Sequence, residues 1–137
     1  MLDTSAALEV VLRRPLAKRF MDRLLKADKD LSSTFFRVEA ANVVAKYIKS
    51  GNLSAEDGGK AFSFCTDMVD EYVPIEVNAT ESFNESIRLG HPAYDMLYFT
   101  LARKNGAVLL TCDKKLLALC KVERVYCVGK EIAGDQP

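Results

Sequence analysis

Hydrophobic positions along the chain follow a helical spacing in some segments and form short continuous runs in others. Val38, Ala41, Ala45 and Ile48 recur at helical spacing, and Ser50-Gly51-Asn52 ends that helix. This pattern predicts helices over residues 5–13, 17–26, 38–49, 54–72, 80–89, 92–105 and 116–120. It predicts strands over residues 1–3, 31–36, 73–77, 107–112 and 122–128.

The order of these elements indicates the fold class. Strands alternate with helices, and several strands are apolar on both faces, as in parallel sheets that are covered by helices on both sides. We therefore expect an α/β fold with a mainly parallel central sheet. A chain of 137 residues has the usual size of one domain, so we expect a single domain over residues 1–137.

The helix predicted at residues 92–105 has Pro92 in its first turn, where proline is tolerated, and Asn105-Gly106 at its end. Apolar side chains at helical spacing predict the face that it buries. This expected buried stripe consists of Tyr94, Leu97, Tyr98, Leu101 and Ala102.

Composition indicates a globular protein outside the membrane. Hydrophobic residues make up 49% of the chain and charged residues 28%. The N-terminus lacks the features of a secretory signal, and no apolar run approaches the ~18 residues of a spanning helix. We therefore expect a cytoplasmic protein that does not bind membranes. The four cysteines have no C-x-x-C spacing, which favours buried reduced thiols over a zinc site or disulfides.

Charge is balanced overall but unevenly distributed. The net charge of zero argues against a wholly electrostatic nucleic-acid binder. Residues 13–29 and 103–130 each carry seven bases and two acids, whereas residues 54–90 carry eight acids and two bases. One interpretation is that these segments are solvated helix faces. The other is that the two basic segments contact a polyanion, while the acidic middle segment contacts something else.

Four acidic residues stand at positions that suggest a shared site. Asp3 and Asp113 are each the first charged residue after a predicted strand, where ligands of parallel sheets collect. Asp95 and Glu39 stand near the starts of helices. Each acid taken singly also fits a helix cap or a first-turn carboxylate. Together, however, converging carboxylates raise one another's pKa and destabilise the fold unless a cation, most economically a divalent one, neutralises them.

Four segments resemble, in order and spacing, the sequence blocks of PIN domains, especially the ribonuclease toxins of VapC type. They are MLDTSAAL, RVEAANVV, AYDMLYFTLARKNGAVLLTCD and the following KKLL. The resemblance covers nearly the whole chain, and residues 94–113 are its most specific part. It implies a three-layer α/β/α sandwich around the parallel sheet and metal-dependent cleavage of RNA.

The resemblance also implies the site residues. The acidic quartet would be Asp3, Glu39, Asp95 and Asp113, and the adjacent polar positions would be Ser5, Asn42 and Thr111. PIN domains usually carry several residues before the first acid, whereas this chain has Met1 and Leu2 alone. Either its first strand is short or the sequence begins late.

Carboxylates of this kind suit Mg²⁺ or Mn²⁺, which take hard oxygen ligands together with water and substrate phosphate oxygens. We assign Asp3, Asp95 and Asp113 to metal contact. Glu39 is either a further ligand or the base that orients the attacking water. Ser5, Asn42 and Thr111 would hold carboxylates or the phosphate, and local turn and cap hydrogen bonds are the alternative.

The leading hypothesis is a toxin-type endoribonuclease that cleaves structured RNA such as transfer RNA. In keeping with the resemblance, it would be a homodimer, inhibited by a cognate antitoxin whose basic side chain enters the acidic pocket. Candidates for contact with the RNA backbone are Arg13, Arg14, Lys18, Arg19, Lys114 and Lys115. His91, the only histidine, is interpreted as a helix-start residue. Core or dimer contacts are expected of Phe62, Phe64, Phe83, Tyr94 and Tyr98.

Two other hypotheses remain. One is a non-catalytic PIN-like module that binds RNA or protein. The other is a phosphoacceptor receiver domain, which needs an adjacent acid pair before its acceptor aspartate. That pair is missing here, because Met1 and Leu2 are the residues that precede Asp3.

Overall fold

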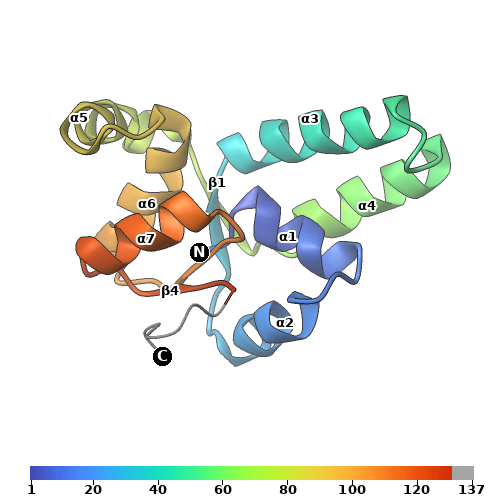
Figure 1. The fold of residues 1–137 in the computed structure, drawn as a ribbon, viewed down its shortest axis with the longest axis horizontal. Helices are drawn as coiled ribbons and strands as arrows, with labels where there is room; N and C mark the ends of the chain where they lie inside the picture. The colour runs from blue at the N-terminus through green and yellow to red at the C-terminus, as the bar shows by residue number, and fades with distance from the viewer. Residues whose placement is uncertain (131–137) are drawn as a thin grey trace.

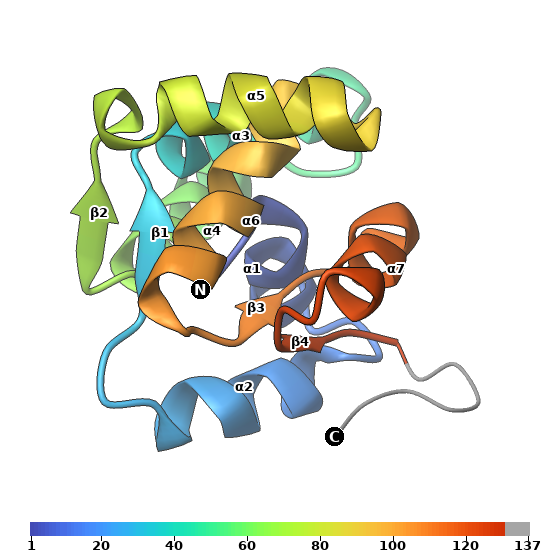
Figure 2. The same ribbon diagram turned by 90° about the vertical axis from the view of Figure 1, so that its left-hand side faces the viewer.

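Short parallel strands form the centre of this computed structural model, which describes residues 1–130. The parallel pairs are β1 (Leu31–Ser33) with β2 (Glu71–Val73), and β3 (Leu109–Leu110) with β4 (Cys127–Val128). Leu2 joins the two pairs, because it forms a parallel bridge to Leu110 and donates its N–H to the carbonyl of Leu31 at 2.9 Å. Figure 2 shows the resulting order: β2, β1, the N-terminal segment, β3 and β4. The prediction of parallel strands is confirmed.

Helices cover both sides of these strands. On one side lie α1 (Thr4–Val11), α3 (Phe35–Lys49) and α4 (Ala55–Asp67), with α2 (Ala17–Lys26) packed against α1. On the other side lie α5 (Ala79–Leu89), α6 (Ala93–Asn105) and α7 (Lys114–Val122). Figure 1 shows these two groups to the right and left of β1. The structure thus has the three-layer α/β/α arrangement expected of it.

Helix α6 is the main core element of its layer, because it contacts β1, β3, α5 and α7. Gly106 ends it in the left-handed conformation at φ 59°. The predicted stripe is wrong at Tyr94, because this residue is 53% exposed. Met96 and Phe99, which were not in that stripe, are fully buried. A helix enclosed on several sides buries more than one stripe, so its periodicity gives an incomplete list of core residues.

Several predicted boundaries are wrong for local reasons. The strand expected at 31–36 ends at Ser33, whose Oγ accepts the Phe35 N–H, and α3 begins directly afterwards. The helix expected at 54–72 ends at Asp67, because the chain turns to place β2 beside β1. The strand expected at 73–77 is β2 followed, after Pro74, by the 3₁₀ helix η1 (Ile75–Val77). The strand expected at 122–128 is limited to β4, since α7 continues to Val122.

The cysteines and the helices agree with two simpler expectations. Within residues 1–130 all four cysteines are free, and three of them are buried. The described part of the chain also contains no helix with the length and apolar character that crossing a bilayer requires.

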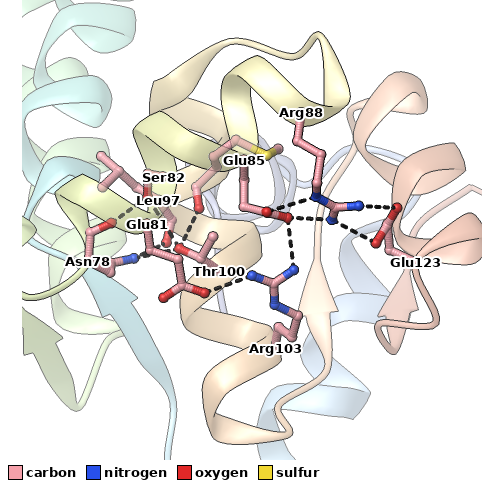
Figure 3. A network of polar contacts seen from close by, with 10 residues as sticks. Asn78, Glu81, Ser82, Glu85, Arg88, Leu97, Thr100, Arg103 and Glu123 are labelled. Atoms are coloured by element: carbon pink, nitrogen blue, oxygen red, sulfur yellow. Dashed lines mark hydrogen bonds and ion pairs between the residues drawn. The ribbon is translucent and has the colours of Figure 1, made fainter.

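A polar network ties α5, α6 and α7 together (Figure 3). Arg103 donates to Glu81 at 2.7 Å and to Glu85 at 2.9 Å, and Arg88 links Glu85 to Glu123. The hydrogen bonds from Arg88, followed by that from Arg103, lower the pKa of Glu85 to about 2. Beside these ion pairs a buried cluster formed by Asn78, Ser82 and Thr100 joins α5 to α6.

Replacing Arg103 by Gln is expected to lower the free energy of unfolding by about 1–2 kcal/mol, because it removes two ion pairs and the contact with the Phe99 ring. Glu85 has a lowered pKa in the folded state, so the difference should be present at neutral pH and shrink as the pH falls toward 2. Urea unfolding of the variant and the unaltered protein measures this difference in the free energy of unfolding. The exposed neighbour Lys104, changed to Gln, is the control, and equal losses in the two variants would refute the role of the network.

Candidate active site

The four acids predicted from the sequence line one pocket. It has a volume of about 320 Å³ and lies where α1, α3, α6 and the β3–α7 connection meet. Asp3, Glu39, Asp95 and Asp113 are among its lining residues, although 110 positions separate the first from the last. The structure therefore brings together carboxylates that come from four different parts of the chain.

Asp3 combines a helix cap with a place in the pocket. Its Oδ1 accepts hydrogen bonds from the Ala6 N–H at 2.9 Å and the Ser5 hydroxyl at 2.7 Å, so that it caps α1. The side chain is nearly inaccessible, since the residue is 4% exposed. Burial raises the pKa of Asp3 to about 7, against the effect of hydrogen bonds from Thr111, Ala6 and Ser5. The nearby charge of Glu39 raises it further.

Asp95 and Asp113 approach each other from α6 and α7. Asp113 caps α7 by accepting the N–H groups of Lys115 at 2.8 Å and Leu116 at 3.2 Å. Asp95 lies in the first turn of α6, as predicted. Burial raises its pKa to about 6, and repulsion from Asp113 is the next largest cause. The nearby charge of Asp113 therefore disfavours ionisation of Asp95.

Glu39 reaches the pocket from α3. Because α3 begins at Phe35 rather than at 38, Glu39 lies in the second turn and not at the helix start. Its Oε1 accepts a hydrogen bond from the Tyr98 hydroxyl at 2.9 Å, and that hydroxyl lies 3.2 Å from Thr4 Oγ1. Burial raises the pKa of Tyr98 well above its usual range, so that it remains a neutral donor. Tyr98 is thus both a core residue, as expected, and a support for Glu39.

Two of the three predicted polar residues, Ser5 and Thr111, form hydrogen bonds next to Asp3 and Asp113. Ser5 Oγ donates to Asp3 and accepts the Cys112 N–H at 2.9 Å, and thereby ties α1 to the end of β3. Thr111 is fully buried, and its Oγ1 accepts the Asp113 N–H at 3.0 Å. Asn42 is exposed and is not among the residues that line the pocket, although it follows Glu39 by about one helical turn.

One group of side chains has the spacing of a metal site. Among residues 1–130, His91, Asp95 and Asp113 each offer a ligand atom, and these atoms lie within 4.8 Å of one another. Carboxylate oxygens and an imidazole nitrogen are a donor set that fits a divalent cation. Asp95 and Asp113 line the acidic pocket, whereas His91 is not among its lining residues. Asp3 lines the pocket but does not belong to this group of ligand atoms.

The sequence did not indicate several other residues of the pocket. Thr4, Glu9, Val43 and Tyr47 line it, as does Arg14, which was expected only as a contact for RNA. The Arg14 guanidinium donates to the Tyr47 hydroxyl at 3.0 Å. These neighbours come from different helices, so no local motif identifies them. His91 could have been found from the sequence, because it lies four residues before Asp95, near the start of α6.

The other basic and aromatic residues proposed from the sequence are not among the residues that line the pocket. Lys18 pairs with Asp22 at 3.0 Å, and Arg19 donates to the carbonyl of Gly129 at 2.8 Å. Other candidate side chains are exposed: Arg13, Lys114, Lys115, Phe64 and Phe83. Phe62 is partly buried against the core.

Comparison with known proteins agrees with the fold. The family model described as PIN domain matches residues 1–122. The crystal structure of PAE2754 from Pyrobaculum aerophilum is similar, with a TM-score of 0.66 and 21% identity, and the match covers 85% of this chain and 81% of that one. At this identity the likeness shows the fold. No match was found among curated proteins. The chain belongs to the PIN domain family.

Proposed function

We propose that the protein is a Mg²⁺- or Mn²⁺-dependent endoribonuclease that hydrolyses RNA phosphodiester bonds, as the toxin of a VapBC-type pair. PIN domains are generally metal-dependent nucleases, and this chain has an acidic cluster with metal-site spacing. The observation that carries the proposal is the convergence of Asp3, Glu39, Asp95 and Asp113 on one pocket. Burial and mutual repulsion raise the pKa values of Asp3 and Asp95, which is the expected consequence of a site built for a cation.

Each acid has a role in this proposal. Asp95 and Asp113 would hold the cation directly, and Asp3 would contact it directly or through water. A bound divalent cation supplies a bound water of lowered pKa and shields the phosphate charge. Glu39, oriented by Tyr98, would hold the attacking water or act as a further ligand. Ser5 and Thr111 keep Asp3 and Asp113 in place through their hydrogen bonds. For Asn42 the proposed role is contact with the substrate phosphate.

The partners and the setting belong to the same proposal. We infer a single-domain cytoplasmic protein that acts on structured RNA such as transfer RNA, and a cognate antitoxin that blocks the acidic pocket with a basic side chain. A homodimer is supported by exposed apolar side chains around a groove of about 560 Å³ between α3, η1, α5 and α6. Val38 and Tyr94 are the most exposed of its large hydrophobic residues.

Cleavage mapping with and without metal tests the proposed reaction. The purified protein should cut transfer RNA internally when Mg²⁺ or Mn²⁺ is added, and a chelator should stop the reaction. Cleavage that continues in excess chelator would refute the metal-dependent mechanism. RNA binding with no cleavage at any metal concentration would instead indicate the non-catalytic PIN-like module.

A further inference from the structure

His91 lies beside the acidic pocket, in the short connection between α5 and α6. Gly90 ends α5 in the left-handed conformation at φ 64°, and Pro92 precedes the first residue of α6. Between them, the His91 N–H donates to the Ser86 carbonyl at 3.2 Å, and the Ser86 hydroxyl donates to the His91 carbonyl at 2.5 Å. The imidazole is 11% exposed. The backbone of His91 is therefore tied to the last turn of α5, and its imidazole is largely buried.

The ring nitrogen of His91 points at the carboxylates. Its Nε2 lies 3.2 Å from Asp95 Oδ2. One ligand atom each of His91, Asp95 and Asp113 lies within 4.8 Å of the other two. Two ligands on bonds of about 2.1 Å at right angles are themselves about 3 Å apart. The spacing between Nε2 and Oδ2 is thus close to that of neighbouring ligands on one cation.

We infer that His91 is a nitrogen ligand of the divalent cation proposed for the acidic pocket, and that this ligand makes the site prefer Mn²⁺ to Mg²⁺. The inference rests on the proposed function, because it assigns a ligand to that same site. Imidazole is a good ligand for transition metals, whereas Mg²⁺ favours oxygen and keeps its waters. The Nε2 lone pair is available for the cation when Nδ1 carries the ring proton.

Pulsed electron paramagnetic resonance on Mn²⁺ bound to the full-length, RNA-free protein tests the inference directly. His91 is the only histidine of the chain, so a protein without a histidine tag has one imidazole that can give directly bound nitrogen coupling. We expect this coupling in the unaltered protein and its loss in His91→Gln and His91→Asn. Calorimetry should show Mn²⁺ affinity reduced at least about tenfold in these variants, with Mg²⁺ affinity nearly unchanged.

The controls separate this inference from the proposed function. Asp57→Asn changes an exposed first-turn aspartate of α4 and should keep both the coupling and the affinity, whereas Asp95→Asn should weaken both metals. Mn²⁺ binding that depends on Asp95 but shows no nitrogen coupling would overturn the His91 assignment alone, and would leave His91 as a hydrogen-bond donor to Asp95. Failure of the unaltered protein to bind Mn²⁺ would overturn the proposed metal centre together with the inference.

Discussion

Replacing Asp95 by Asn should lower metal-dependent RNA cleavage by at least about 100-fold. The exchange keeps the shape of the side chain but removes a charge that lies beside Asp113 and His91. The fold should tolerate it, because burial and repulsion from Asp113 already disfavour the ionised form of Asp95. Initial rates on end-labelled transfer RNA in saturating Mn²⁺ give the effect, and circular dichroism reports on the fold.

A matched control distinguishes loss of a site charge from loss of any first-turn aspartate. Asp57 and Asp95 both lie in the first turn of a helix, α4 and α6 respectively. Asp57, however, is not among the residues that line the pocket. Asp57→Asn should cleave like the unaltered protein. Full activity in the Asp95 variant, or equal losses in both variants, would remove the acidic pocket from the reaction.

The metal-free protein should become less stable as the pH rises through neutrality. Asp3 has a pKa of about 7 in the folded state against an ordinary value of 3.8. The folded state therefore binds this proton more tightly than the unfolded state does. The resulting stabilisation is complete below the unfolded value and is lost as the pH rises through 7. Its size is up to about 4 kcal/mol, at 1.36 kcal/mol for each pH unit. Asp95, whose pKa is also raised, acts in the same direction.

Asp3→Asn isolates this contribution, because the amide oxygen can still cap α1 while the buried charge is removed. Urea unfolding at pH 5 and pH 8 in chelator should show a smaller loss of stability in the variant than in the unaltered protein. Mn²⁺ at pH 8 should restore much of the stability of the unaltered protein, since a ligand that binds the folded state stabilises it. Identical pH profiles for both proteins would contradict a buried Asp3 carboxylate of raised pKa.

The order of elements could be predicted because strands and helices leave different hydrophobic periods in the sequence. Asp3 and Asp113 could be predicted because each is the first charged residue after a predicted strand. Their two interpretations, cap and site residue, are not exclusive: both cap helices and both line the pocket. In each case Oδ1 of the carboxylate accepts the backbone N–H of the helix that it caps.

What the sequence could not predict depends on contacts between distant segments. The exposure of Tyr94 and the burial of Met96 follow from the way α6 is enclosed by its neighbours. The support of Glu39 by Tyr98 joins residues 59 positions apart, and the place of Arg14 in the pocket depends on the turn between α1 and α2. None of these relations has a local pattern.

The most direct test of the cation-binding pocket is an anomalous difference map from crystals soaked in Mn²⁺. A peak within bonding distance of Asp95 and Asp113, absent from crystals of the Asp95→Asn variant, is the predicted result. Saturating Mn²⁺ that gives no peak in this pocket, or peaks only at other surface carboxylates, would contradict the account.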